Sequence, residues 1–144
     1  YDIVCETNIN RQLLATTKTV GLPKVEVLKD RLLDINPDLE INVFNCAYNE
    51  TSADSFCLDT YDFVIDAIDS LKDKAHLIRK VTSLDRPVLF SSMGAALKMD
   101  PFRIKKSEFW KVKGDGLARA LRNRFRKENS YPLKKFLCVW SDEI

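Results

Sequence analysis

A short apolar run that ends in an acidic residue, residues 63–69, constrains the fold more than any other feature of the sequence. Five of the six residues before Asp69 are apolar, so the run lacks the alternation of a half-exposed strand. A continuous run of this length is typical of a strand that is buried on both faces, as in a parallel sheet. Pro87–Phe90 is a second run of the same kind. We therefore expect two strands of a parallel sheet here.

The segment between these runs predicts a helix, because apolar residues recur there at helical spacing and Asp69 or Ser70 can cap its first turn. The order strand–helix–strand predicts an α/β fold, Rossmann-like, with a mostly parallel sheet and flanking helices. Other segments predict, in chain order, a strand end at Ile3–Val4, a short helix at Asn10–Ala15, a helix from Pro23 to Asn36, a strand at Ile41–Phe44, a strand at Arg103–Ile104, a basic helix at Gly116–Lys127 and a last strand at Phe136–Trp140.

The composition is that of a globular chain with a core of its own. The 144 residues are 45% hydrophobic, and no apolar run approaches the roughly 20 residues of a membrane helix. No C-x-x-C spacing occurs, which argues against a zinc knuckle or a disulfide scaffold. We expect a cytoplasmic protein with no membrane partner. Its four cysteines are expected to be small apolar fillers: Cys5, Cys46, Cys57 and Cys138.

The charge is unevenly distributed along the chain. Residues 98–135 carry 13 Lys and Arg against 4 Asp and Glu, a balance of +9, whereas residues 1–97 carry a balance of −5. Such asymmetry favours a polyanionic partner for the basic segment. A solvated helix face with an adjoining loop explains the same charge without any partner. From charge alone the two interpretations are even.

Polar side chains collect where the expected strands end, and ligands of an open parallel sheet bind beyond the carboxyl ends of its strands. An arginine and a lysine near a strand-end aspartate are typical of a nucleotide triphosphate site. The cations neutralise phosphate charge, and the carboxylate holds a Mg²⁺ that bridges phosphate oxygens. Taken singly, Arg11 is a surface arginine and Asp69 a helix cap. The candidates are Asn8, Asn10, Arg11, Gln12, Lys24 and Asp69.

Four motifs follow one another in an order that resembles one family. They are TNINRQ at residues 7–12, TVGLPK at 19–24, INP at 35–37 and DAIDS at 66–70. The series resembles the N-x-x-R-Q, G-x-x-K, I-N-P and D-x-x-D segment of the HesA/MoeB/ThiF (ubiquitin-activating-enzyme-like) superfamily, over about residues 1–100. The resemblance implies an adenylate-forming enzyme that uses ATP and Mg²⁺.

Site roles follow from the same resemblance. It implies that Asn8, Arg11 and Lys24 contact the ATP phosphates and that Gln12 supports them. The second acid of D-x-x-D, Asp69, would handle the magnesium ion. Arg11 and Asp69 are the catalytic residues that the resemblance implies.

The subfamily is indicated by SSMGAALKMDP at residues 91–101 and GDGLA at 114–118. These segments are similar to the tRNA threonylcarbamoyladenosine dehydratases, which activate a threonyl carboxylate with ATP and close a ring as AMP leaves. The implied partner is tRNA, with a sulfur-transfer protein as a further candidate and a homodimer as the assembly. A polyanionic substrate gives the basic segment a partner. The candidate RNA contacts are Lys105, Lys106, Arg119, Arg122, Arg124 and Arg126.

The absence of a glycine-rich loop is the departure from the family with the largest consequence. The four glycines of the sequence cannot form the glycine-rich phosphate loop, so we expect a piece of a longer protein that binds ATP poorly by itself. We interpret the piece as one activating-enzyme-like domain, with a nucleotide-binding part at residues 1–100 and a basic substrate or dimer segment at residues 101–144. Two alternatives stay open. One is an adenylyltransferase for the carboxyl terminus of a ubiquitin-like sulfur-carrier protein, and the other is a catalytically silent module for RNA binding or dimerisation.

Overall fold

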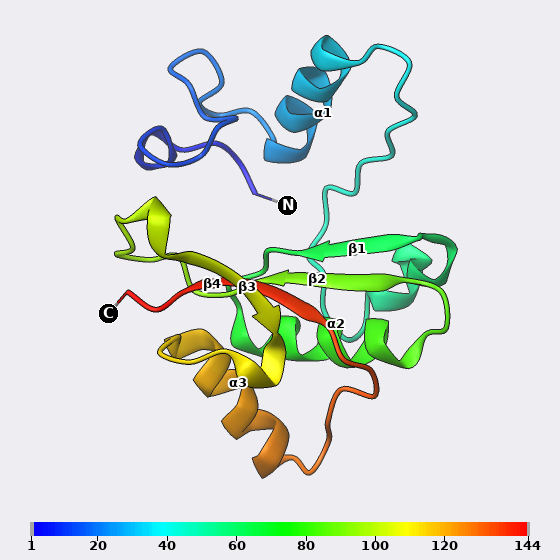
Figure 1. The fold of residues 1–144 in the computed structure, drawn as a ribbon. Coiled ribbons are helices and arrows are strands. Elements are labelled where there is room, and N and C mark those ends of the chain that lie inside the picture. Colours follow the sequence, from blue (N-terminus) through cyan, green and yellow to red (C-terminus); the bar gives the residue numbers. More distant parts are fainter. Residues whose placement is uncertain (1, 144) are drawn as a thin grey trace. The chain divides into compact units, whose positions relative to one another are not determined.

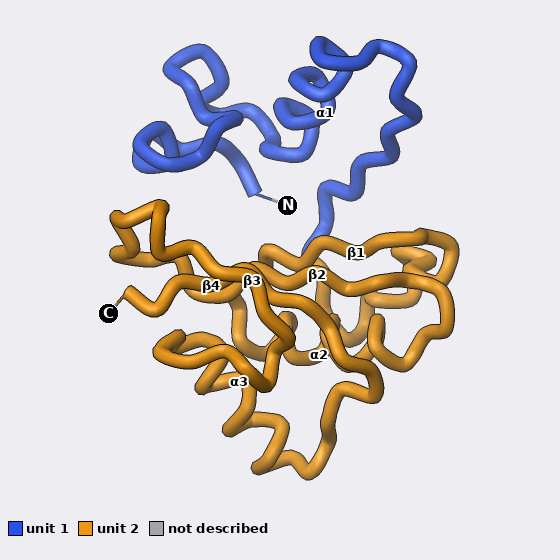
Figure 2. Tube along the Cα trace, viewed as in Figure 1, with its two compact units in different colours: residues 1–47 blue, residues 48–144 orange. Residues whose placement is uncertain are grey.

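The computed structural model describes residues 2–143. The chain divides into two compact units, residues 1–47 and residues 48–144 (Figure 2). Residues 100 and 101, where the sequence suggests a functional division, both lie within the second unit. That functional division stays a prediction.

The elements follow one another along the chain as Figure 1 shows. The α-helices are α1 (Lys24–Ile35), α2 (Leu71–Ser83) and α3 (Gly116–Lys127), and the strands are β1 (Phe63–Asp66), β2 (Val88–Ser92), β3 (Ile104–Glu108) and β4 (Leu137–Ser141). Short 3₁₀ helices are η1 (Glu6–Asn8), η2 (Ala53–Phe56), η3 (Leu58–Thr60), η4 (Pro101–Arg103) and η5 (Phe109–Lys111). No helix among residues 2–143 has the length and apolar character needed to cross a bilayer.

Four strands of the second unit form one sheet in the order β1-β2-β4-β3. β1 and β2 are parallel, with Phe63 opposite Val88, and β2 and β4 are parallel, with Ser91 opposite Cys138. β3 runs antiparallel to β4. The α/β fold with a mostly parallel sheet is therefore confirmed.

Helix α2 connects β1 to β2, as the sequence predicts. Its N-cap is Ser70, whose side chain accepts a hydrogen bond from the amide of Asp73. The predicted apolar stripe is buried, since Ala75, Ile78 and Val81 have no exposed surface. Burial of these side chains against the sheet fixes α2 in place, because each buried aliphatic side chain contributes roughly 1.5–3 kcal/mol.

Helix α3 packs beside α2, on the same side of the sheet (Figure 1). Its Leu121 and Phe125 join Phe109, Phe136 and Cys138 in the core of the second unit. The rings of Phe109 and Phe136 stack with centroids 4.9 Å apart. Both helices thus bury their apolar faces against one surface of the sheet.

The opposite face of the sheet is largely exposed. Phe63 and Ile65 of β1 are 65% and 81% exposed, and Val88 of β2 is 50% exposed. The expectation that β1 is buried on both faces is therefore wrong for the described structure. The physical reason is that α2 and α3 lie on the same face, so only alternate side chains of the strand are covered.

The first unit has a small core of its own, formed by Val4, Ala15 and Val27. Helix α1 begins after Pro23, as predicted, because proline suits the start of a helix. It ends at Asn36, the C-cap, and the proline that follows cannot continue the helical hydrogen bonds.

Three predicted elements of the first unit are wrong. The strand end at Ile3–Val4 is a single antiparallel bridge between Ile3 and Pro23. Residues 10–15 form turns instead of a helix, because their backbone hydrogen bonds do not continue into a helical series. Residues 41–44 form no strand, because they lie outside the four-stranded sheet that the described residues form.

The cysteine prediction holds for one residue only. Cys138 is fully buried in the core. Cys5, Cys46 and Cys57 are exposed, so their interpretation as apolar fillers is wrong. The reason is that all three lie in segments outside α-helices and β-strands, where no core forms around them.

Candidate functional site

The N-x-x-R-Q motif forms one tight turn in the first unit. The side-chain Oδ1 of Asn8 accepts a hydrogen bond from the amide of Cys5, 3.1 Å away, which fixes the buried Asn8 side chain. The carbonyl oxygen of Asn8 accepts from the amides of Arg11 and Gln12, at 3.1 and 2.8 Å. Asn8, Arg11 and Gln12 are therefore held in one turn, in which the Asn8 carbonyl oxygen binds the amides of the other two residues.

Arg11 is exposed at the end of this turn. Its Nη1 donates to the carbonyl oxygen of Thr7 at 2.6 Å and to Oδ1 of Asn10 at 3.0 Å. A guanidinium carries five N–H donors, so these contacts orient the group and still leave donors for an anion.

Lys24 comes from a second segment, which pairs with the beginning of the chain. Its amide donates to the carbonyl oxygen of Asp2, and Gly21 donates to the carbonyl oxygen of Val4. Gly21 has φ +87°, a conformation that side chains disfavour, so the glycine of G-x-x-K is required by the backbone. The Lys24 Nζ hydrogen-bonds the carboxylate of Asp2, and this contact lowers the pKa of Asp2.

Asp69 belongs to the second unit, three residues after β1 ends and just before the N-cap of α2. Its side chain is exposed, and its carboxylate forms no hydrogen bond or ion pair with the described residues. The position at the carboxyl end of a parallel strand is the one that the sequence predicts. A free carboxylate there is available to a cation.

A buried ion pair, which the sequence motifs do not predict, contacts the backbone of Ile68, the residue before Asp69. Asp66 and Lys74 are 1% and 0% exposed, and their Oδ2 and Nζ atoms are 2.8 Å apart. Ser91 of β2 donates a 2.6 Å hydrogen bond to the same Oδ2. The available signal was a lysine next to the apolar stripe of α2, which is unusual because lysine is rarely buried unless it is paired.

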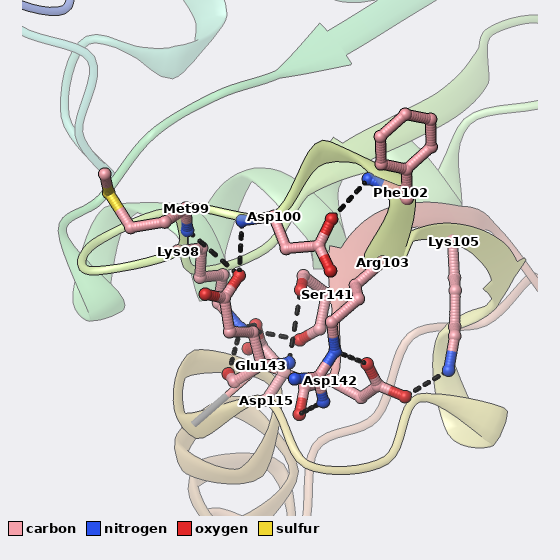
Figure 3. A network of polar contacts seen from close by, with 10 residues as sticks. All are labelled: Lys98, Met99, Asp100, Phe102, Arg103, Lys105, Asp115, Ser141, Asp142 and Glu143. Atoms are coloured by element: carbon pink, nitrogen blue, oxygen red, sulfur yellow. Dashed lines mark hydrogen bonds and ion pairs between the residues drawn. The ribbon is translucent and has the colours of Figure 1, made fainter.

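A cavity of about 290 Å³ opens at the carboxyl ends of β2 and β4, next to Lys98. The Lys98 ammonium donates to the carbonyl oxygens of Ser141 and Glu143 and lies 3.7 Å from the carboxylate of Asp115 (Figure 3). Its charge is therefore satisfied from within the protein. Methionine and tryptophan side chains also line the cavity, which suits an uncharged, partly apolar group better than a phosphate.

The residues after β4 hold the loop that borders this cavity. The Glu143 carboxylate accepts hydrogen bonds from the amides of Met99 and Asp100, at 2.9 and 3.0 Å (Figure 3). These bonds lower the pKa of Glu143. Asp142 pairs with Arg103 and Lys105. The carboxylates of Asp142 and Glu143 therefore hold residues 98–105 in place.

Structure separates the six candidate RNA contacts into two groups. Lys105 pairs with Asp142, Arg124 pairs with Glu128, and Arg122 lies over the Phe109 ring, 5.7 Å from its centroid. The other three have no ion pair within residues 2–143. They are Lys106, Arg119 and Arg126, and all three are exposed.

Comparison with known proteins decides the family. A model described as the ThiF family matches residues 1–125, most of the chain. The chain belongs to the ThiF family. This confirms the superfamily that the four sequence motifs indicate.

Relatives of this ThiF-family chain carry a more specific name. It is 41% identical over 143 residues to the tRNA threonylcarbamoyladenosine dehydratase of Bacillus subtilis, which covers 99% of the chain and 55% of the relative. The crystal structure of the Escherichia coli tRNA N6-threonylcarbamoyladenosine dehydratase in complex with ATP superposes with a TM-score of 0.89 at 36% identity, covering 99% of this chain and 60% of that one. The same E. coli enzyme is also solved with AMP.

The ThiF-family chain spans about half the length of the curated relatives it matches. A more distant match is the adenylyltransferase and sulfurtransferase of Culex quinquefasciatus, 34% identical over 100 residues, which cover 69% of this chain and 22% of that relative. The Culex quinquefasciatus relative is named for adenylyl and sulfur transfer, whereas the Bacillus subtilis and Escherichia coli relatives are named as tRNA threonylcarbamoyladenosine dehydratases. The dehydratase match extends over a larger part of the chain.

Asp69 is the candidate magnesium ligand that the sequence motifs indicate. Residues 2–143 contain no group of three or more metal-binding side chains. Magnesium does not need such a group, because it keeps several waters and is held by one or two carboxylates together with substrate phosphates. The free carboxylate of Asp69 fits that mode.

Proposed function

We propose that this protein is an ATP-dependent tRNA-modifying dehydratase. It would adenylate the threonyl carboxylate of threonylcarbamoyladenosine and then close a ring with release of AMP. The observation that carries the proposal is the match to enzymes of this name over 99% of the chain. The turn that holds Asn8, Arg11 and Gln12 together supports it.

In the first step, a carboxylate oxygen of the substrate forms a bond to the α-phosphorus of ATP, and the bond to pyrophosphate breaks. Negative charge develops on the phosphate oxygens, so the cations Arg11 and Lys24 stabilise that transition state. Asn8 would donate a hydrogen bond to a phosphate oxygen, with Gln12 supporting the turn. Asp69 would hold a Mg²⁺, which would supply positive charge to offset that of the phosphates.

In the second step, a nucleophilic atom of the same modified nucleoside attacks the activated carbonyl carbon. The bond to AMP breaks, and the two steps together remove one water from the nucleoside. AMP is a good leaving group, so this step needs mainly orientation of the substrate. Exposed cations outside the nucleotide site would hold the tRNA: Lys106, Arg119 and Arg126.

The assembly and location follow from the same proposal. We expect a cytoplasmic homodimer, to which a sulfur-transfer protein can bind as a further partner. Sedimentation of the intact protein would test the dimer, because a monomer at micromolar concentration would contradict it.

The decisive experiment compares substrates. The intact protein is incubated with ATP, Mg²⁺ and tRNA that either carries or lacks threonylcarbamoyladenosine. The expected result is pyrophosphate release and loss of one water from the nucleoside, by mass spectrometry, only with the modified tRNA. Activity on unmodified tRNA alone would contradict the proposal.

A second candidate is an adenylyltransferase for a ubiquitin-like sulfur-carrier protein, favoured by the match to the Culex quinquefasciatus relative. A carrier protein with a free carboxyl terminus serves as the third substrate in the same experiment. Adenylation of the carrier, together with stoichiometric zinc in the intact protein, would favour this candidate. If no substrate is adenylated, the remaining interpretation is a silent RNA-binding or dimerisation module.

A further inference from the structure

The buried pair of Asp66 and Lys74 joins three elements of the second unit. Asp66 is the last residue of β1, Lys74 lies in the first turns of α2, and Ser91 is in β2. Both charged side chains are completely removed from solvent. The carboxyl end of β1, the start of α2 and the neighbouring strand are therefore connected through a single carboxylate.

The same pair also holds the backbone of Ile68, the residue before Asp69. Asp66 Oδ1 accepts a hydrogen bond from the Ile68 amide at 3.0 Å. Lys74 Nζ donates to the Ile68 carbonyl oxygen, also at 3.0 Å. Asp66 thus binds the amide of Ile68, and its ion-pair partner Lys74 binds the carbonyl oxygen of the same residue. The position of the next residue, Asp69, is restricted as a result.

Stability alone is a poor explanation for such a pair. Removing two charges from water is costly, and replacing a buried ion pair by apolar side chains of similar size is often neutral or stabilising. A buried pair that fixes the backbone beside a candidate metal-binding carboxylate has a use that apolar residues cannot supply.

We propose that Asp66 and Lys74 are positioning residues that hold Asp69 in place for the Mg²⁺ of the nucleotide. The inference rests on the proposed function, in which Asp69 binds that ion. Ser91 assists by orienting the Asp66 carboxylate from the neighbouring strand. Neither member of the pair touches the nucleotide or the ion, since both are fully buried.

Lys74→Met in the intact protein tests this proposal, because methionine keeps the length of the side chain and removes the charge. We expect the Mg²⁺ concentration for half-maximal pyrophosphate release to rise about 10-fold or more, the usual effect of losing a group that orients a metal ligand. The turnover at saturating Mg²⁺ should fall much less. Mn²⁺ binding to the complex with a non-hydrolysable ATP analogue, followed by electron paramagnetic resonance, should weaken in parallel.

Lys80→Met is the matched control. Lys80 lies in the last turn of the same helix, at the end away from Asp69, and pairs at the surface with Asp54 at 2.7 Å. Its Mg²⁺ dependence and Mn²⁺ binding should equal those of the parent. Hydrogen exchange should become faster at the Ile68 amide in Lys74→Met and remain unchanged in Lys80→Met.

Ser91→Ala provides a milder variant in case Lys74→Met does not fold. It removes one hydrogen bond from Asp66, and we expect a smaller rise in the Mg²⁺ requirement, on the order of 3-fold. A folded Lys74→Met or Ser91→Ala protein with the parent's Mg²⁺ dependence overturns the positioning role.

Asp69→Ala distinguishes the positioning role of Asp66 and Lys74 from the metal-binding role of Asp69 itself. A strong Mg²⁺ effect in Asp69→Ala but none in Lys74→Met overturns the positioning role and leaves the proposed function standing. No effect in either variant overturns the positioning role and also the assignment of Asp69 to the ion, whereas the dehydratase function is tested separately by the modified and unmodified tRNA.

Discussion

Oδ1 of Asp115 accepts a 2.8 Å hydrogen bond from the amide of Ala118, which makes the buried Asp115 the N-cap of α3. Asp115→Ala removes this bond and leaves an amide at the helix start without a partner. We expect the free energy of unfolding to fall by about 1–2 kcal/mol, measured by urea denaturation. Asp115→Asn retains a capping oxygen, so an equal loss in that variant would contradict the capping explanation.

Gly116 is the first residue of α3, a position where proline is favoured. Asp115 before it has φ −88° and ψ 125°, which a residue preceding proline can adopt. The space around Gly116 is open, with no atom within 4 Å of an added Cβ. Gly116→Pro should therefore raise the free energy of unfolding by about 0.4–1 kcal/mol, because the unfolded chain loses freedom. A lower melting temperature would contradict this expectation.

Arg11→Ala and Asp69→Ala should each lower turnover of the intact protein about 100-fold or more, on the order of 3 kcal/mol of transition-state stabilisation. Single-turnover formation of AMP is the measurement. Arg31→Ala and Asp30→Ala, both at exposed positions of α1, are matched controls and should retain parent activity. Near-normal turnover in both site variants would remove these residues from the mechanism.

Neutralising Lys106, Arg119 and Arg126 to glutamine should weaken tRNA binding and flatten its salt dependence. Each lost phosphate contact lowers the slope of log K against log salt by about 0.7–0.9. Lys18, Arg31 and Lys72, which are exposed outside the basic segment, form a control triple that should leave the slope unchanged. An unchanged slope in the first triple, with an altered sedimentation coefficient, would instead place the basic segment at a subunit contact.

Burial raises the pKa of the Cys138 thiol to about 12. Since the folded pKa lies above the unfolded value, the thiol contributes stability at low pH, and this contribution is lost as the pH rises from about 9 towards 12. Urea unfolding over this range measures the loss. Cys138→Val, which keeps a small apolar side chain, should show a shallower decline with pH, whereas an identical decline would exclude Cys138 as its source.

Alkylation offers an independent measurement of the same burial. In the folded protein at about pH 8, iodoacetamide should leave Cys138 unmodified, because the thiol is both inaccessible and protonated. The exposed cysteines should react, and mass spectrometry of peptides distinguishes them: Cys5, Cys46 and Cys57. Full modification of all four in the folded state would contradict the buried position.

The sequence predicts the second unit well because its signals are local. The continuous run before Asp69, the stripe of α2 and the basic α3 each have a clear boundary in the sequence, so residues close in sequence determine them. The first unit is less predictable. Residues 10–15 carry helix-compatible residues, but local hydrogen bonds close separate turns there. The Ala15 amide donates to the Gln12 carbonyl oxygen, and Thr19 Oγ1 donates to the Leu14 carbonyl oxygen.

The sequence motifs predict which residues belong to the candidate site, but they do not predict the contacts that hold those residues in place. Asn8 and Arg11 share one turn, which their three-residue spacing already suggests. The link between Asp66 and Lys74 joins residues eight positions apart in different elements, with a third partner, Ser91, in another strand. No periodic pattern specifies such a contact, because it depends on how α2 lies over the sheet.

The pairing register of β3 and β4 determines which lysine of the edge strand forms an ion pair and which does not, among the described residues. Lys105 is opposite Trp140 and Lys106 is opposite Val139, and successive side chains of a strand point to opposite faces. Lys105 consequently lies over the indole and pairs with Asp142, whereas Lys106 remains unpaired among the described residues. A slip of the ladder by one residue would exchange the two faces, so the alignment of backbone hydrogen bonds, and not the number of lysines, sets the electrostatic pattern of this edge.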